Sequence, residues 1–239
     1  MAVSFLSKLI DPMHAYGIIL LSIAGFLLCR IPFAGKWFRG FDTLFHETGH
    51  ALVALLVGGD THAIDLYADT SGKTIFSAKG KIRNLLIYLA GYPFSALCGM
   101  IIYVSIWLQQ QQFALLFLVS VILLNMALWI RNTYGWVWTL INLAGLFSLL
   151  YLNVLIWDQV FLVLIASWVS IDALYSSWVL LMLNFKKPAG DAGELQKITH
   201  IPAPIIAFLF LLFNLLCFVI SFLLVSGNAD IIKQCWNGL

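Results

Sequence analysis

Charged side chains are scarce in this sequence of 239 residues. Only 10% are Asp, Glu, Lys or Arg, whereas a soluble globular protein is about one quarter charged. Hydrophobic residues make up 62% of the chain, more than a soluble fold could shield from water. We therefore expect the lipid bilayer to surround most of the protein. The formal net charge is only +2 and no basic tract occurs, so we expect no nucleic-acid partner.

Cysteine and glutamate are scarce as well. The four cysteines form no CxxC pair, so we interpret them as packing residues, which argues against a disulfide framework or a zinc knuckle. The sequence contains two glutamates, Glu47 and Glu194. Because Glu47 lies between two histidines inside an apolar run, it is a candidate for chemistry, since unpartnered polar groups at membrane depth are unfavourable.

Long apolar runs are abundant. A helix that spans a membrane needs about 20 predominantly apolar residues. The runs predict an all-α polytopic membrane protein with about seven transmembrane helices, folded as a single multipass domain over residues 1–239. The candidate spans are 14–29, 41–58, 84–108, 113–130, 135–153, 159–183 and 203–225.

The segment between the second and third spans differs from the rest. Residues 61–81, THAIDLYADTSGKTIFSAKGK, alternate apolar and polar residues on both sides of a turn, which predicts a short β-hairpin. Nine lysines and arginines fall on the hairpin side of the predicted spans and four on the other. By the positive-inside rule, we expect the hairpin and the N-terminus in the cytoplasm, and the protein in the cell (inner) membrane.

The motif HETGH within FHETGHALVALLVGG carries the clearest chemistry. On a helix, His46 and His50 project from one face one turn apart, which is the spacing at which two imidazoles bind one zinc ion. Glu47 can face the open position of the metal and act as a general base for water. About 10 Å of helix separates His50 from Val57, so the site would lie in the membrane near its cytoplasmic face.

Four segments together resemble a known family. The HETGH helix and the hairpin are followed by LAGYPFSALCG, then by LLNMALWIRNTYGWVW and GDAGELQKITHIPAPI. Over residues 41–210 the chain resembles the site-2 protease class of intramembrane zinc metalloproteases, peptidase family M50, and most closely its M50B-like branch. The resemblance implies that His46 and His50 bind zinc, that Glu47 is the general base, and that the substrate is a transmembrane protein.

A third zinc ligand is needed, because hydrolytic zinc sites use three protein ligands and a water. Site-2 proteases supply an aspartate after an Asn-x-x-Pro segment, but the matching segment from Asn125 contains none, and Asn132 stands near that place. Our first candidate is Asp191, in a segment similar to an SDA-like segment of the M50B-like branch. A helix-capping role for it, with Glu194 three residues on, is an alternative. Asp172, deep in the sixth span, is the second candidate.

Two functions follow from these features. We expect a zinc-dependent intramembrane endopeptidase that hydrolyses peptide bonds of transmembrane substrates within the lipid bilayer. The alternative is a catalytically incomplete, protease-like membrane protein that binds or helps assemble transmembrane helices. The aspartate missing after Asn125 is the feature that favours this alternative.

Overall fold

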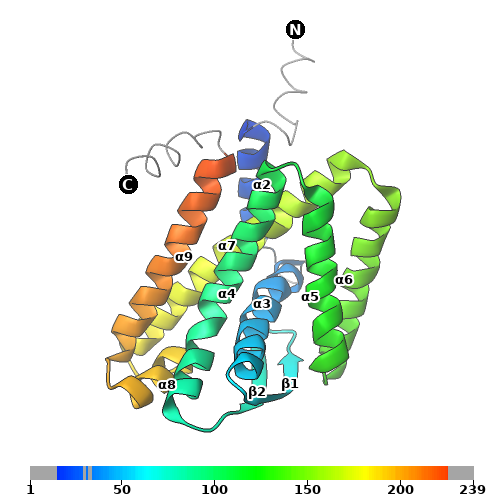
Figure 1. The fold of residues 1–239 in the computed structure, drawn as a ribbon. Coiled ribbons are helices and arrows are strands. Elements are labelled where there is room, and N and C mark those ends of the chain that lie inside the picture. Colours follow the sequence, from blue (N-terminus) through cyan, green and yellow to red (C-terminus); the bar gives the residue numbers. More distant parts are fainter. Residues whose placement is uncertain (1–14, 29–30, 32–33, 226–239) are drawn as a thin grey trace.

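A computed structural model describes residues 15–28, 31 and 34–225 as a bundle of helices with one β-hairpin (Figure 1). Helices α4, α7 and α9 pack against one another, α3 packs on α4, and α5 pairs with α6. The elements are α2 (Ala15–Leu28), α3 (Ala34–Leu56), β1 (Asp60–Leu66), β2 (Gly72–Ser77), α4 (Lys81–Trp107), α5 (Gln111–Leu128), α6 (Thr133–Leu152), α7 (Leu155–Asn184), α8 (Gly190–Thr199) and α9 (Ala203–Val225).

The predicted fold class is confirmed. In the described part of the chain, five helices are long and apolar enough to cross a membrane, namely α4, α5, α6, α7 and α9. They coincide with five of the seven predicted spans. The first predicted span, 14–29, corresponds to α2, which is a short apolar helix, and the second, 41–58, corresponds to α3, which begins earlier and is more polar than we expected.

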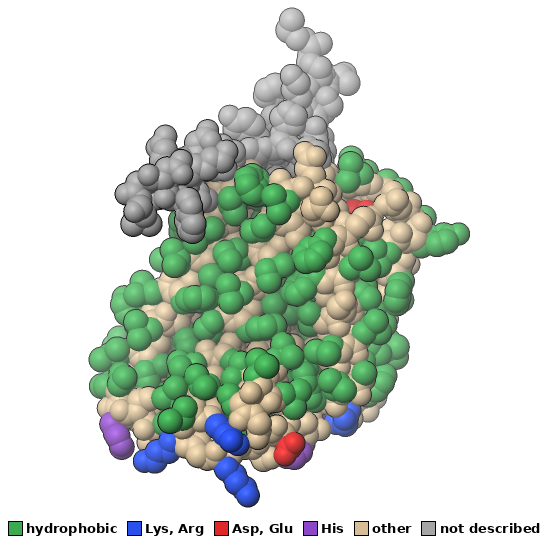
Figure 2. All heavy atoms as spheres, viewed as in Figure 1, with side chains coloured by type: hydrophobic (Ala, Val, Ile, Leu, Met, Phe, Trp, Pro, Cys, Tyr) green, Lys and Arg blue, Asp and Glu red, His purple; other side chains and the backbone are tan. Residues whose placement is uncertain are grey.

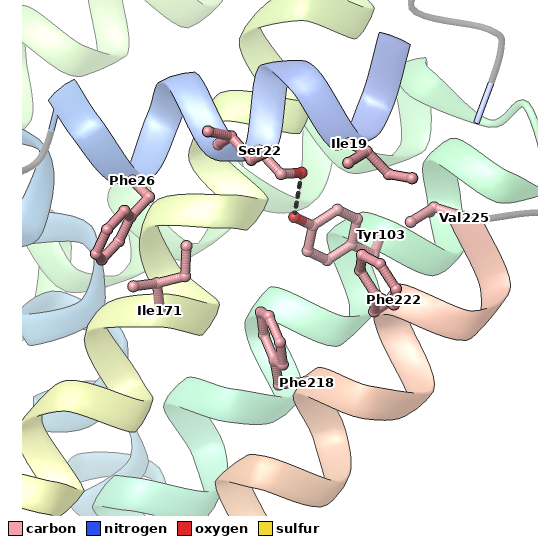
Figure 3. Close-up of a pocket in the computed structure, with 9 residues that line it drawn as sticks. Ile19, Ser22, Phe26, Tyr103, Ile171, Phe218, Phe222 and Val225 are labelled. Atoms are coloured by element: carbon pink, nitrogen blue, oxygen red, sulfur yellow. Dashed lines mark hydrogen bonds between the residues drawn. The ribbon is translucent and has the colours of Figure 1, made fainter. Parts of the chain in front are cut away.

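Helices α2 and α3 together cross the bundle once. The 14 residues of α2 reach about 21 Å, short of the roughly 30 Å hydrocarbon core. Ile19 of α2 lies beside Val225 at the end of α9 (Figure 3), opposite the hairpin and α8 (Figure 1). The N-terminus, which we predict to be cytoplasmic, lies outside the described residues; the described part of α2 begins at the end of the bundle opposite the hairpin (Figure 1).

The hairpin lies against α3 at the same end of the bundle as α8 (Figure 1). Its strands are antiparallel, with Ile64 opposite Thr74. The backbone N–H of Ile64 donates to the Trp129 carbonyl over 2.8 Å, and the Asn132 side chain bonds both backbone groups of Leu66. The link between α5 and α6 therefore holds β1 in place. Strand β2 contacts α3 through Thr74 and α4 through Phe76.

The surface matches a membrane protein. Hydrophobic side chains cover the length of the bundle, and lysine and arginine side chains gather at the hairpin end (Figure 2). An apolar cavity of about 360 Å³ lies at the opposite end, between α2, α4, α7 and α9 (Figure 3). Its wall contains a hydrogen bond of 3.1 Å between the hydroxyls of Ser22 and Tyr103.

Candidate metal centre

His46 and His50 lie one turn apart on α3 and face α4. Their rings fit against α4 because residue 91 is glycine. A Cβ at this position would lie 2.5 Å from His46 Cε1 and 2.5 Å from His50 Nε2. Gly91, Ser95 and Gly99 form a stripe of small residues on one face of α4, and the space beside Gly91 is filled by the two imidazoles.

Each imidazole is held by a contact with α4. His50 Nδ1 lies 2.7 Å from the Ile87 carbonyl oxygen, which can only accept a hydrogen bond. The proton of a neutral His50 ring is therefore on Nδ1, and Nε2 carries a lone pair. The His46 ring meets the Tyr92 ring edge to face, with centroids 4.6 Å apart. Both rings are thus fixed in orientation.

Asp191 reaches the histidines from α8. It is the second residue of that helix, where the helix dipole favours a negative charge. Its Oδ2 atom lies 3.3 Å from His46 Nε2 and 3.2 Å from His50 Nε2, and the two Nε2 atoms are 3.1 Å apart. Three atoms that can donate lone pairs therefore meet in a nearly equilateral triangle.

This triangle fits a tetrahedral metal. Bonds of about 2.0 Å at tetrahedral angles place neighbouring ligand atoms about 3.3 Å apart. Oδ2 of Asp191 is buried and has no hydrogen-bond partner among the described residues. A buried acceptor without a donor is unfavourable, and a cation between the three atoms would satisfy it. His46, His50 and Asp191 could therefore hold a metal ion.

The charge of Asp191 fits the same role. Burial opposes ionisation of its carboxyl, but His50 and His46 more than offset this effect and hold its pKa below the usual range. The side chain is therefore a carboxylate at neutral pH. A carboxylate and two imidazoles form a ligand set that zinc accepts.

Glu47 borders the group without joining it. The Thr74 hydroxyl of β2 lies 2.6 Å from its Oε2 atom, which orients the carboxylate. Gly72 of β2 leaves the space for it, because a Cβ there would lie 2.8 Å from Glu47 Oε1. Only 7% of Glu47 is exposed. A fixed carboxylate beside a metal-ligand group has the position that a general base requires.

Two polar cavities meet at this point. One, of about 270 Å³, contains the three candidate ligands and is walled by β2, Tyr88 and Tyr92. The other, of about 180 Å³, is lined by Arg39, Asp42 and Asp172. His46, Glu47, Gly72 and Tyr92 border both.

The other candidate ligands lie elsewhere. The Asp172 carboxylate is 2.7 Å from Arg39 Nε, in an ion pair that joins α7 to α3. Asn132 is the N-cap of α6, where its side chain accepts from the Gly135 N–H. The capping role considered for Asp191 is wrong, because Ala189 is the N-cap of α8 and Glu194 pairs with Lys197. The structure thus brings Asp191 alone of the three to the histidines.

Sequence reasoning missed the residues that hold these side chains. Thr74 orients Glu47, Ile87 holds His50 through its backbone, and Tyr92 packs on His46. No local pattern marks them, because each contact joins separate elements. Gly91 is the exception, because the spacing of Gly91, Ser95 and Gly99 in the sequence predicts a small-residue stripe that another helix can approach closely.

Comparison with known proteins agrees with the site. No curated protein and no solved structure matches the chain. The family model described as Peptidase M50B-like matches residues 18–221, which is most of the sequence. The resemblance seen in the sequence is confirmed, and the chain belongs to the Peptidase M50B-like family.

Proposed function

We propose that the protein is a zinc-dependent intramembrane endopeptidase. The observation that carries this proposal is the triangle of His46, His50 and Asp191, beside a glutamate fixed by Thr74. In this proposal the three residues are the zinc ligands and Glu47 is the general base. Zinc, when bound, polarises the scissile carbonyl and lowers the pKa of a water molecule to about 7.

Glu47 moves the protons of the reaction. Its carboxylate accepts a proton from the attacking water and then transfers it to the nitrogen of the leaving amine. The Thr74 hydroxyl keeps the carboxylate in one orientation throughout. Because Glu47 itself is buried, its hydrogen bond with Thr74 is partly shielded from water.

The substrate follows from the place of the site. A peptidase of this family in a bilayer acts on membrane proteins, and we propose a transmembrane helix as the substrate. A helix with its side chains is about 10–12 Å wide. The cavity of about 270 Å³ admits a short extended segment instead. The substrate helix would therefore unwind locally before cleavage.

The side of the membrane follows from charge. Eight lysines and arginines of the described residues lie in the hairpin, the start of α4, the α5–α6 link, the α7–α8 link or α8. They gather at the hairpin end (Figure 2). By the positive-inside rule, the hairpin end faces the cytoplasm, and the protein lies in the cell (inner) membrane. The metal centre would then be reached from the cytoplasm.

The alternative function now has less support. It rested on the aspartate missing after Asn125, but Asp191 supplies a carboxylate beside both histidines. No other observation favours an incomplete site.

One experiment tests the enzyme. Purified wild-type protein and Glu47→Gln are compared for zinc content and for cleavage of a panel of quenched fluorescent transmembrane peptides in phosphatidylcholine vesicles. We expect one zinc per chain in both proteins and cleavage by the wild type alone. Wild-type protein without zinc, or Glu47→Gln with full activity, would refute the proposal.

A further inference from the structure

Peptide hydrolysis places a negative charge on the scissile carbonyl oxygen, and neither the proposed zinc ligands nor Glu47 donates a hydrogen bond to that oxygen. As water attacks, the scissile carbonyl oxygen becomes an oxyanion, and hydrogen-bond donors aimed at it lower the barrier. Besides the histidines, four side chains with donor protons line the metal cavity: Lys73, Thr74, Tyr88 and Tyr92. The following inference rests on the proposed function and identifies the donor.

Two of the four donors are unsuitable. The Thr74 hydroxyl has one proton, and it lies 2.6 Å from Glu47 Oε2. Lys73 is exposed on β2, and its flexible ammonium is a poorly preorganised donor. The phenols of Tyr88 and Tyr92, one turn apart on α4, remain. A phenol keeps its proton at neutral pH and can donate it in a hydrogen bond.

Tyr92 is the better placed of the two phenols. Its ring is held on one side by the edge-to-face contact with His46, at 4.6 Å, and on the other by stacking with Phe210, at 5.0 Å. It borders both polar cavities together with His46 and Glu47. Tyr88 borders only the metal cavity, and its ring packs against Phe76 of β2.

The Tyr92 ring is thus fixed beside a candidate ligand and the candidate base. A ring held on both sides does not have to reorganise when charge develops, which is what makes a donor effective. Among the described residues, the structure gives its hydroxyl no hydrogen-bond partner. Its proton is therefore available to a substrate that enters between the two cavities.

We propose that Tyr92 is a catalytic residue whose hydroxyl donates a hydrogen bond to the scissile carbonyl oxygen as that oxygen becomes the oxyanion. The water oxygen forms a bond to the carbonyl carbon, and the π electron pair moves onto the carbonyl oxygen. Tyr92 retains its proton throughout. Glu47 takes the proton of the water and gives it to the amide nitrogen, the C–N bond breaks, and the C=O bond forms again.

Tyr92→Phe tests this role, because phenylalanine keeps the ring contacts with His46 and Phe210 and removes only the hydroxyl. We expect kcat to fall about 100-fold, as for the loss of one oxyanion donor, with little change in KM and the same zinc content. Tyr151→Phe is the control, with kcat close to the wild type, because Tyr151 is exposed on α6 and borders neither polar cavity.

A binding measurement separates catalysis from packing. A phosphinic peptide resembles the tetrahedral intermediate, and its affinity is measured by calorimetry on the zinc-loaded protein. We expect Tyr92→Phe to weaken binding of this analogue about as much as it lowers kcat/KM. The uncleaved substrate peptide should bind equally well to Glu47→Gln and to the double variant that carries Glu47→Gln and Tyr92→Phe.

The outcomes are distinct. A Tyr92→Phe variant with wild-type kcat and analogue affinity would overturn the inference and leave the proposed function standing. Loss of zinc from Tyr92→Phe would also overturn it, because the residue would then only position His46. A wild-type protein without zinc or activity would overturn the proposed function and the inference with it.

Discussion

Replacing Gly91 by alanine should remove the metal without unfolding the bundle. The added Cβ would lie 2.5 Å from His46 Cε1 and from His50 Nε2, which is 0.9 Å short of the 3.4 Å at which ordinary contact begins. Both rings are flanked on the other sides, His46 by Tyr92 and His50 by the Ile87 carbonyl. At least one ring must therefore move by a large part of this distance.

The displacement is large compared with what a metal tolerates. Ligand distances in zinc sites are fixed to within about 0.2 Å, and changes to the groups that merely orient ligands already reduce affinity about 10- to 100-fold. Moving a ligand itself by a sizeable fraction of an ångström should reduce zinc affinity by more than about 100-fold. Alanine otherwise favours a helix over glycine by roughly 0.5–1 kcal/mol, so the helix itself should not be destabilised.

Zinc titration of the metal-free protein, followed by calorimetry, measures the effect. Gly145→Ala in α6 is the matched control, since a Cβ at this position meets nothing within 4 Å. We expect Gly145→Ala to bind zinc like the wild type and Gly91→Ala to bind it weakly, with both variants folded by circular dichroism. Wild-type zinc affinity in Gly91→Ala would refute the geometry of the ligand pair.

Three further changes test the surroundings of the site. Thr74→Val removes the hydroxyl that orients Glu47, so kcat should fall about 10-fold with zinc content unchanged. Thr74→Ser should restore kcat, whereas a Thr74→Val variant with wild-type kcat would contradict this role. Asp172→Asn leaves Arg39 without its carboxylate partner. The free energy of unfolding should fall by roughly 1–3 kcal/mol, because the pair is only partly buried, while zinc binding persists. Thermal unfolding in detergent measures the loss of stability, and an unchanged midpoint would argue against a stabilising ion pair. Asp191→Ala should lose zinc while Glu194→Ala keeps it, since Glu194 pairs with Lys197, and zinc retained in both would exclude Asp191 as a ligand. In the wild type, zinc content should fall as the pH is lowered, because protons compete with the metal for the imidazoles. The pKa of Asp191 lies below its usual range, so its carboxylate becomes protonated only at a lower pH than an ordinary aspartate. Zinc content that does not change with pH would contradict this ligand set.

Local geometry explains what could be predicted from sequence. His46 and His50 share a face because four residues make about one helical turn, and the bounds of α9 match the predicted 203–225 because its apolar run ends at clear polar segments. The hairpin was likewise predicted from alternation and a turn. These features depend on neighbouring residues only.

Features that depend on contacts between distant segments could not be predicted. Asp191 and Asp172 were both plausible ligands by sequence, and only the packing of α8 against α4 decides which one reaches the histidines. The start of α3 was placed too late because Lys36 and Arg39 interrupt the apolar run. Arg39 is tolerated in the helix since its charge is paired with Asp172, which sequence does not show.

The polar groups of α3 form one stripe whose members find partners on four different elements. Residues 39, 42, 46 and 50 recur every three or four positions and so share one helix face, and Glu47 lies at the edge of this face, three positions before His50. The partners are Asp172 on α7 for Arg39, Ser95 on α4 for Asp42, Thr74 on β2 for Glu47, and Asp191 on α8 for His46 and His50. In the first three pairs a donor meets an acceptor, so each pair is satisfied by itself. In the last, two imidazole nitrogens and the buried Asp191 Oδ2 lie within 3.3 Å of one another, and a metal cation between them would satisfy all three. The same rule that explains the structural pairs of α3 therefore singles out its histidines as the place for the metal.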